Sequence, residues 1–537
     1  MRRQAHPKQA LKINVHGGDT ADIDLPSSND PSTLCREATG HRYCVNFGRF
    51  MEEDTKKAEA NLPLAVDLDG TLIRTDSLQE SLLQLLRAHP EGLIRLPTAL
   101  LRGRAAFKQA VMDAIDVDDL QLPINASVLD FLQTEKQTGR QILLVTAANH
   151  AIAEAIAEGI GLFDAVIASD ATHNLKGQHK ADALVARFGA RGFDYIGDSR
   201  ADLPVWQQAR KAYVVGDQRL LQAACQVADA EAVPGKASER SRLPAILHAL
   251  RPHQWVKNLL LFLPLVAAHM VTDSAALVAV ILAFVAFSLT ASAVYLLNDL
   301  LDLPADRRHP RKRQRPFAAG DLPLHWGVLL APALLMAAAL LSVLALPDLF
   351  ALVLAGYFLL TTAYSFSLKR KPVVDVILLA ALYTVRVIAG AAAVAIVPSF
   401  WLLAFSMFIF LSLALAKRYT ELDGLRERGE LTAAGRGWHV DDLPLVQTLG
   451  TGAGLASVLV LALYINSAQA QQLYATSEIL WLVCPLLLYW IARLWFKTHR
   501  GEMHDDPVVF ALRDRVSLAT GALTALTVFT ATAGLPR

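Results

Sequence analysis

Three aspartates stand at helical spacing between a long apolar run and a dense basic block. Asp299, Asp302 and Asp306 are three and four residues apart, so on a helix they lie along one face. Three carboxylates that close repel one another and favour a bound cation. Mg²⁺ prefers oxygen ligands and commonly binds together with substrate phosphates. The stretch therefore predicts a Mg²⁺–diphosphate site, with Asn298 as a neutral ligand and with basic residues to hold further phosphate oxygens, namely Arg307, Arg308, Arg311, Lys312, Arg313 and Arg315.

A second group of polar residues stands where short apolar strands end. Asp67 and Asp69 follow the first expected strand, and period two puts both on one side of it. Thr146 and Asp198 follow two later strands. Strands that alternate with helical stretches predict a parallel α/β sheet. In such a sheet the carboxyl ends of the strands lie at one edge, so these polar residues should meet there. The expected strands are Leu64–Val66, Ile142–Val145, Ala165–Ala168, Tyr195–Ile196 and Tyr213–Val215.

The chain has 537 residues, a net charge of +1 and 53% hydrophobic residues, and the balanced charge argues against nucleic acid as a partner. The average hides two unlike halves. Residues 1–60 are polar and unpatterned, and we expect them to be largely disordered. We assign 61–225 to an α/β domain, 226–250 to a flexible linker and 251–537 to an all-α membrane domain. The four cysteines lack metal-type spacing and predict no disulfide framework.

Apolar runs of about 17–25 residues recur beyond residue 250, each long enough to cross a bilayer. Four of the connections between them are rich in Lys and Arg, and the others are short or nearly uncharged. Basic connections stay in the cytoplasm, so we expect the N-terminal domain to be cytoplasmic and the C-terminus to lie outside. Nine spans are expected, at 254–271, 276–297, 325–346, 349–368, 373–397, 400–416, 446–466, 478–496 and 516–534.

The expected fifth span contains two charged residues. Asp375 and Arg386 are eleven residues apart, about three helical turns, so they share a similar face and should point into the bundle. Charges in membrane segments usually mark a functional site. A structural ion pair or a charge at the membrane edge is the alternative interpretation.

The stretch NDLLDLPADRRHPRKRQRPFAAG resembles the first aspartate motif of the UbiA superfamily of intramembrane prenyltransferases, and the resemblance extends over about 250–537. The stretch that begins at Tyr364, with Asp375 and Arg386, and Leu415-Ala-Lys-Arg-Tyr-Thr-Glu-Leu resemble the decaprenyl-phosphate phosphoribosyltransferase branch. That resemblance implies transfer of phosphoribose from phosphoribosyl pyrophosphate to a polyprenyl phosphate. Mg²⁺ at the three aspartates would hold the leaving pyrophosphate.

The same resemblance distributes the basic residues between two phosphate groups. Arg307, Lys312 and Arg315 would neutralise the pyrophosphate. The lipid phosphate or the sugar 5-phosphate would be held by a second set, with Tyr364 beside it, namely Lys369, Arg386, Lys417 and Arg418. A lipid-facing patch that only orients the protein is the alternative interpretation of the basic block.

Residues 62–225 resemble the haloacid dehalogenase (HAD) superfamily of phosphatases. The matching segments are DLDGT at 67–71, Thr146 after its strand, GQHK at 177–180 and GDSRAD at 197–202. The resemblance implies that Asp67 is the nucleophile, Asp69 the general acid and base, and Thr146 and Lys180 the phosphate ligands. Mg²⁺ would bind Asp67 and Asp198, with Asp202, under a helical cap at about 76–125. A catalytically inactive regulatory domain of this fold is the alternative.

Together these features predict a bifunctional enzyme of the bacterial inner membrane, in which the phosphatase removes the 5-phosphate of the lipid-linked product. The nearest alternative is an aromatic prenyltransferase, which would need a second aspartate triplet after the sixth span. That region contains Asp423 but no triplet. A transporter with a regulatory soluble domain, or a phosphatase with an unrelated soluble substrate, are further alternatives. Membrane lipids are expected partners, and the oligomeric state stays open.

Overall fold

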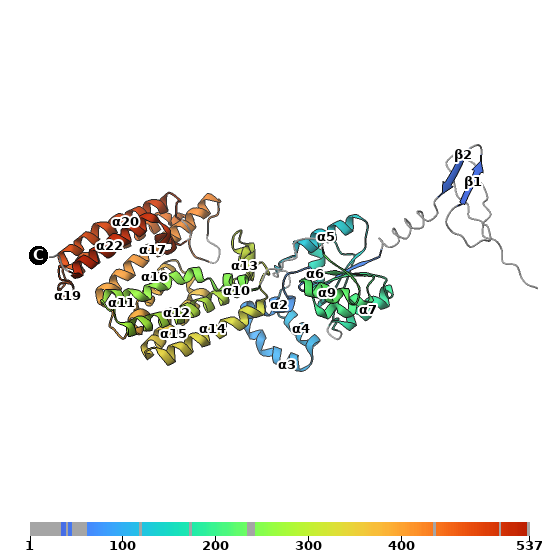
Figure 1. Ribbon diagram of the computed structural model, residues 1–537, viewed down its shortest axis with the longest axis horizontal. Helices are drawn as coiled ribbons and strands as arrows, with labels where there is room; N and C mark the ends of the chain where they lie inside the picture. Colours follow the sequence, from blue (N-terminus) through green and yellow to red (C-terminus); the bar gives the residue numbers. More distant parts are fainter. Residues whose placement is uncertain are drawn as a thin grey trace, which may run out of the picture.

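The structure is a computed structural model that describes residues 34–38, 41–45, 62–116, 121–170, 174–233, 242–432, 436–503 and 506–533. An α/β domain and a helical bundle lie end to end, with helix α2 (Ser77–Ala88) between them (Figure 1). Both expected fold classes are confirmed.

The α/β domain contains a parallel sheet of six strands, and β3 (Leu64–Val66), the first of these strands in the chain, lies at its centre. Side chains of this strand alternate between the two faces, so Leu64 and Val66 pack with helices α5 and α6, whereas Ala65 packs with α7, α8 and α9. In spatial order the strands are β5 (Ala165–Ser169), β4 (Ile142–Asn149), β3 (Leu64–Val66), β6 (Asp194–Gly197), β7 (Lys211–Val214) and β8 (Asp229–Ala232).

The helices of this domain form two layers and a cap. The layers are α5 (Ala126–Gln137), α6 (His150–Ile160), α7 (Gln178–Phe188), α8 (Leu203–Gln208) and α9 (Gln218–Cys225). The expected helical segment between the first two sequence motifs is present as α2, η1 (Pro90–Arg95), α3 (Leu96–Leu101) and α4 (Arg104–Met112).

Two segments that were expected to be irregular contain regular elements. Within 1–60, Leu34–Ala38 and His41–Val45 pair as an antiparallel hairpin (β1 and β2), and the rest of that segment lies outside the described residues. The linker is shorter than 226–250, because both of its flanks belong to folded elements. Strand β8 pairs with β7 at the sheet edge, and α10 (Arg242–Leu250) packs its apolar side against the bundle.

Eight described helices are long and apolar enough to cross a membrane. They correspond to eight of the nine expected spans. Their bounds are Ser274–Leu301 (α12), Leu324–Ala345 (α14), Asp348–Phe366 (α15), Pro372–Ala393 (α16), Phe400–Glu427 (α17), Val440–Ile465 (containing α18, Leu443–Ile465), Ser477–His499 (containing α20, Val483–His499) and Arg515–Ala533 (α22).

The first expected span, 254–271, is not among these eight helices. It consists of a 3₁₀ helix, η4 (Pro252–Phe262), and a short helix, α11 (Leu263–Ala267), with Pro264 at their junction. The nine-span expectation is therefore not confirmed. The segment nevertheless reaches both ends of the bundle, because Arg251 contacts Asp299 and the His269 ring lies 5.5 Å from the Tyr474 ring. A 3₁₀ helix rises about 2.0 Å per residue, so sixteen residues extend about 30 Å.

The four basic connections meet at one end of the bundle. Asp302 in the first lies 3.5 Å from Lys369 in the second, and Trp438 in the third donates to Asp375 beside the second. Asp506, in the fourth, contacts Lys257 near the start of η4. The α/β domain packs against the same end. The remaining connections lie at the opposite end, where 398–399 and α19 (Ala468–Leu473) line one cavity and Ala276 and Leu346, next to the other two connections, share one apolar cluster.

Close packing of η4 against the bundle predicts a specific sensitivity. A Cβ atom added to Gly390 of α16 would lie 2.0 Å from the Leu261 carbonyl oxygen. We expect Gly390→Ala to destabilise the bundle by about 1–3 kcal/mol, because the η4 backbone must move. Thermal unfolding of the purified protein in detergent measures this effect. Gly356→Ala in α15, where the added atom meets open space, is the matched control, and equal unfolding temperatures would contradict the prediction.

Candidate active sites

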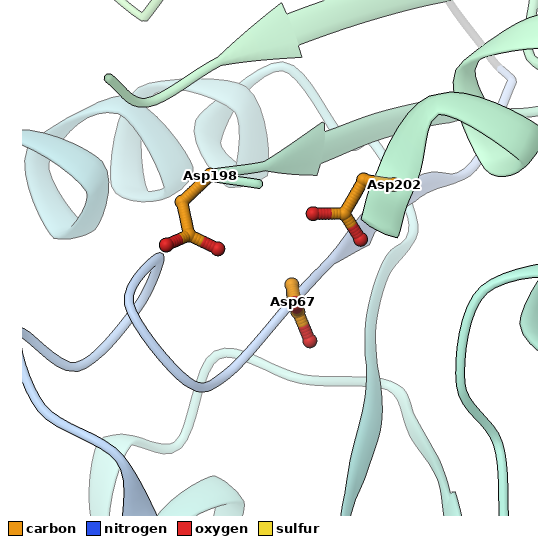
Figure 2. Close-up of side chains that lie close together, drawn as sticks. All are labelled: Asp67, Asp198 and Asp202. Atoms are coloured by element: carbon orange, nitrogen blue, oxygen red, sulfur yellow. The ribbon is translucent and has the colours of Figure 1, made fainter. Parts of the chain in front are cut away.

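Three carboxylates converge at the carboxyl edge of the sheet. Asp67 follows β3, Asp198 follows β6, and Asp202 ends the short helix η3 (Arg200–Asp202). Figure 2 shows their side chains turned toward a common space. One oxygen of each lies within 4.8 Å of the others, and they form the metal-type acidic group found among the described residues. The expected metal ligands of this domain are thus brought together.

The side chain of Lys180, from α7, extends into this acidic group. Its Nζ donates to Asp67 Oδ1 and to the Tyr195 hydroxyl, each at 2.8 Å, and it lies 3.7 Å from Asp202. Tyr195 in turn donates to Asp202 at 3.0 Å. Burial lowers the pKa of Lys180, but the carboxylates of Asp67 and Asp202 outweigh it and raise the pKa, so the lysine stays charged. The sequence interpretation missed Tyr195, because it stands in mid-strand and looks like core.

Burial and mutual repulsion raise the pKa of the acidic groups. The pKa of Asp198 rises to about 8, first through burial and then through the charges of Asp67 and Asp202. Asp69 lies beside this group, and its Oδ1 accepts a hydrogen bond from the Ser77 backbone N–H at 2.7 Å. Burial, and then the charge of Asp76, raises the pKa of Asp69 to about 7. A carboxyl group of this pKa can both donate and accept a proton near neutrality.

The remaining polar positions support this centre. Thr146 is buried, and its hydroxyl accepts from the Ala148 N–H at 2.9 Å. Gly70 has φ +79°, and an added Cβ would lie 2.0 Å from Asp198 Oδ2, so only glycine fits between the two strand ends. From the cap, Lys108 of α4 donates to the Ala147 carbonyl oxygen, which brings this helix over the site.

The site fits Mg²⁺. Three carboxylates, two of them buried, face one lysine, so acidic groups outnumber basic ones, and oxygen is the ligand that Mg²⁺ prefers. The residues that would hold the ion are Asp67, Asp198 and Asp202. Screening of their repulsion is the chemistry that the ion would supply.

The three bundle aspartates are arranged differently from the expectation. Asp299, at the end of α12, and Asp306, in α13 (Leu303–Arg308), are joined by Arg315, whose Nη1 lies 3.1 Å from the first and 2.5 Å from the second. Asp302 points elsewhere, toward Lys369, with 45% of its side chain exposed. The expected three-carboxylate cluster is therefore not formed, because an arginine between two of the carboxylates provides the positive charge that a metal ion would otherwise supply.

Asp299 is still suited to a cation. Arg251 and Arg315 both contact its Oδ1, whereas its Oδ2 is buried and has no hydrogen-bond partner. The guanidinium of Arg251 also lies 5.1 Å from the centre of the Tyr295 ring. Burial raises the pKa of Asp306 despite the opposing charge of Arg315. The pair could hold Mg²⁺ once Arg315 turned to a phosphate, which an arginine binds well.

Asp375 and Arg386 both point into the bundle, as expected, but they belong to separate groups. Asp375 lies 2.8 Å from Arg418 Nη2 and accepts from the hydroxyl of Tyr364 and the indole of Trp438. Arg418 is fully buried and also contacts Glu421. The side chains expected to bind phosphate here, Tyr364 and Arg418, are thus joined by an aspartate.

Arg386 lies in an aromatic and amide environment. Its Nε donates to Asn258 Oδ1 at 2.9 Å, and its Nη2 donates to the Tyr357 hydroxyl at 3.1 Å. Its guanidinium also lies 5.1–5.5 Å from the centres of the Phe287, Tyr357 and Tyr383 rings. No carboxylate among the described residues pairs with it, so it remains a cation that is not neutralised by an acid.

A third polar group contains two residues that the sequence interpretation missed. Asp506 contacts Lys257 and lies 3.9 Å from Lys417. Burial raises the pKa of Asp506, but the two lysines outweigh it and hold the pKa below its usual value. Lys257 stands one turn into an apolar run, a position that can signal a functional lysine, whereas Asp506 lies in a loop that gave no signal.

Three further expected ligands of the diphosphate lie outside these groups. Arg307 contacts Glu80 of helix α2 in the α/β domain, so its assignment to the diphosphate needs correction. Lys312 is exposed in η5 (Lys312–Gln314), and Asn298 is half-buried beside Asp299. Arg307 contacts Glu80 because the two domains pack together at this point. The spacing of residues along one helix does not predict how two domains pack.

Comparison with known proteins gives two family matches. Residues 259–533 match the UbiA prenyltransferase family, and residues 64–207 match haloacid dehalogenase-like hydrolases. The uncharacterized protein y4nM of Sinorhizobium fredii is 38% identical over 507 residues, which cover 93% of this chain and 98% of that protein.

Other relatives match about half of this chain. The decaprenyl-phosphate phosphoribosyltransferase of Mycolicibacterium smegmatis is 34% identical, over 53% of this chain and 92% of its own length. The nodulation protein NoeC of Azorhizobium caulinodans is 37% identical, over 50% and 87%. Among solved structures, a UbiA homolog from Archaeoglobus fulgidus bound to GPP and Mg²⁺ covers 54% of this chain and 98% of its own, with 17% identity and a TM-score of 0.41.

Repulsion among the three sheet carboxylates predicts how Asp198→Asn will behave. Without Mg²⁺ the variant should unfold at a higher temperature than the wild type, because one like charge is removed. Added Mg²⁺ should raise the unfolding temperature of the wild type and leave that of the variant nearly unchanged. Thermal unfolding with Mg²⁺ or with a chelator measures both effects. Asp130→Asn, at an exposed position of α5, is the control. An equal response to Mg²⁺ in Asp198→Asn would refute the assignment.

Proposed function

Because the chain belongs to the UbiA prenyltransferase family and has a haloacid dehalogenase-like domain at its N-terminal side, we propose that it is a bifunctional membrane enzyme. Its bundle transfers 5-phosphoribose from phosphoribosyl pyrophosphate to a polyprenyl phosphate such as decaprenyl phosphate. Its α/β domain then removes the 5-phosphate. The relatives named decaprenyl-phosphate phosphoribosyltransferase support this choice of reaction.

The observation on which the proposal rests is the separation of charge at the polar end of the bundle. Asp299 and Asp306 are paired with Arg251 and Arg315, whereas Lys257 and Lys417 share the one carboxylate of Asp506, and no described carboxylate pairs with Arg386. Two carboxylates that bind a divalent cation, with two arginines beside them, suit a diphosphate. A basic group suits a monophosphate that brings its own negative charge. A diphosphate donor and a monophosphate acceptor would therefore use both groups.

In the transfer step, an oxygen of the lipid phosphate attacks C1 of the ribose. The bond between C1 and the pyrophosphate oxygen breaks, and pyrophosphate leaves with the electron pair. Asp299 and Asp306 would hold Mg²⁺, which neutralises charge on the pyrophosphate when it is bound. Arg315 and Arg251 would bind its outer oxygens, and Lys417 would orient the attacking phosphate.

An apolar cavity of about 800 Å³ offers room for the polyprenyl chain. It lies between α11, α17, α18, α20 and α22, toward the end of the bundle opposite Asp299. Its lining includes Leu263, Trp401, Leu461, Leu487 and Val528. A chain that enters from the bilayer would bury its carbons here while its phosphate stays at the polar end.

In the phosphatase step, a carboxylate oxygen of Asp67 attacks phosphorus, and the bond to the ribose 5-oxygen breaks. Asp69 gives its proton to that oxygen. A water molecule then attacks the aspartyl phosphate, loses a proton to Asp69 and releases inorganic phosphate. Lys180 and Thr146 would hold the phosphate oxygens, and bound Mg²⁺ would screen the repulsion between the two anions.

We also propose nine crossings in the inner membrane, with the polar end of the bundle in the cytoplasm. The basic connections and the α/β domain share that end, as the positive-inside rule requires. The η4–α11 segment would be the first crossing, since it contacts both ends. With it the C-terminus lies outside.

An aromatic prenyltransferase is the second candidate. A second aspartate group would be needed after α17. Asp423 instead lies 2.5 Å from Arg426, and no further described carboxylate joins it in a metal-type group. This arrangement favours the phosphoribosyl reaction.

Labelled phosphoribosyl pyrophosphate tests the transfer. With polyprenyl phosphate and Mg²⁺, the purified protein should form a lipid-soluble labelled product, and Asp299→Asn should lower the rate by about 10²–10³-fold, because an electrostatic contact to the leaving group is lost. Chromatography of the extracted lipids measures the product. Asp348→Asn, at the opposite end of the bundle, is the control. Absence of labelled lipid with the wild type would overturn the proposal.

The phosphatase step is tested separately by Asp67→Asn. This variant should still form the labelled lipid, but the lipid should keep its 5-phosphate, because an amide cannot form the aspartyl phosphate. Mass spectrometry distinguishes the two lipids by one phosphate. Asp130→Asn should give the dephosphorylated lipid. Dephosphorylation at the wild-type rate in Asp67→Asn would show that the α/β domain acts on another substrate.

A further inference from the structure

The two domains are joined by a buried ion pair between Glu80 of α2 and Arg307 of α13. Both guanidinium terminal nitrogens of Arg307 donate to the carboxylate, at 2.6 and 3.0 Å. The side chains are only 4% and 9% exposed. Arg307 also donates to the carbonyl oxygens of Gln121, in the α/β domain, and of Ala318, in the bundle. A single side chain thus binds both domains.

A second contact lies beside the first. Arg74 pairs with Asp321 at 2.8 Å, and the His325 backbone N–H donates to Gln79 of α2 at 3.1 Å. Gly320 has φ +71°, and a Cβ added there would lie 2.6 Å from the Arg74 carbonyl oxygen. The two backbones approach so closely that no side chain fits between them.

Apolar packing continues the same contact. Leu83 of α2 packs with the cluster that contains Leu300 and Leu303, on either side of Asp302 in the bundle. The interface therefore combines apolar packing with one buried bidentate ion pair and one partly exposed ion pair. Loss of one partner of the buried pair would leave an uncompensated charge inside this interface.

The contact residues adjoin the catalytic residues of both domains. On the bundle side, Arg307 follows Asp306 directly in the six-residue helix α13. On the other side, Glu80 is one helical turn after Ser77, whose N–H binds Asp69. Three residues of helix are only about 4.5 Å long. The Glu80–Arg307 ion pair therefore lies one helical turn from a residue that binds Asp69 and directly beside Asp306 in the chain.

We infer that Glu80 is a positioning residue of the transferase centre, acting through Arg307 on the helix that contains Asp306. The inference rests on the proposed function of the bundle. If Glu80 lost its charge, the buried guanidinium of Arg307 would lack its anion. Helix α13 would then lose its contact with the α/β domain at Arg307, and Asp306, the residue before it, would no longer be held in place to bind the cation of the diphosphate.

Hydrogen–deuterium exchange of the full-length protein in detergent tests the positioning without any reaction. In Glu80→Gln, and independently in Gly320→Ala, the amides of 303–308 should exchange at least tenfold faster than in the wild type. Glu91→Gln, at an exposed position of the same cap, and Gly356→Ala, where the added atom meets open space, are matched controls that should leave exchange unchanged. The charge exchange of Glu80→Arg with Arg307→Glu should restore slow exchange in part.

The Mg²⁺ dependence of the lipid-linked product gives the second measurement. Glu80→Gln should need at least tenfold more Mg²⁺ for half-maximal transfer, with little change in the rate at saturation. Unchanged exchange at 303–308 together with an unchanged Mg²⁺ requirement would overturn the inference. Equally fast exchange in strand 142–149 would also overturn it, because a docking contact predicts local loosening. If the wild type forms no labelled lipid but exchange changes as expected, the proposed function fails while the docking role stands.

Discussion

Repulsion between buried carboxylates is the constraint on which both centres depend. In the α/β domain, three acids face one lysine, so acidic groups outnumber basic ones and the pKa of Asp198 rises to about 8. In the bundle, two acids face two arginines, so the site is neutral. The first arrangement is ready for a divalent cation. In the second, the arginines must move away from the aspartates before a cation can bind. An arginine is also the side chain best suited to bind the phosphates of an incoming substrate.

The elements that position the first centre could be predicted well from the sequence. Short apolar strands ending in Asp67, Thr146 and Asp198 gave the parallel sheet and its active edge, because period-two side chains and parallel strand ends follow from local geometry. The eight long spans were predicted for a similar reason, since hydrophobic length is a local property. The η4–α11 segment was harder, because its conformation depends on packing against α16.

The polar partners within the bundle could not be predicted in this way. Helical spacing placed Asp375 and Arg386 on similar faces, yet Asp375 contacts Arg418 and Arg386 contacts Asn258 from other helices. Spacing along one helix predicts which residues share a face. It does not predict which side chains of the neighbouring helices they contact. The same reason explains Arg307, whose partner Glu80 stands 227 residues earlier in the chain.

Contact between the two domains explains why their fusion in one chain would be useful. In the proposed sequence of reactions, the intermediate stays in the bilayer through its polyprenyl chain, and only its phosphoribose reaches the aqueous phase. A phosphatase held at the polar end of the bundle meets that group at high local concentration, whereas a free enzyme must first find the membrane. The cost is restricted movement, because Arg307 holds α2 through Glu80, and Asp321 holds Arg74 in the segment before α2. The lipid-linked phosphate must therefore move to the phosphatase, and its long, flexible chain allows that movement.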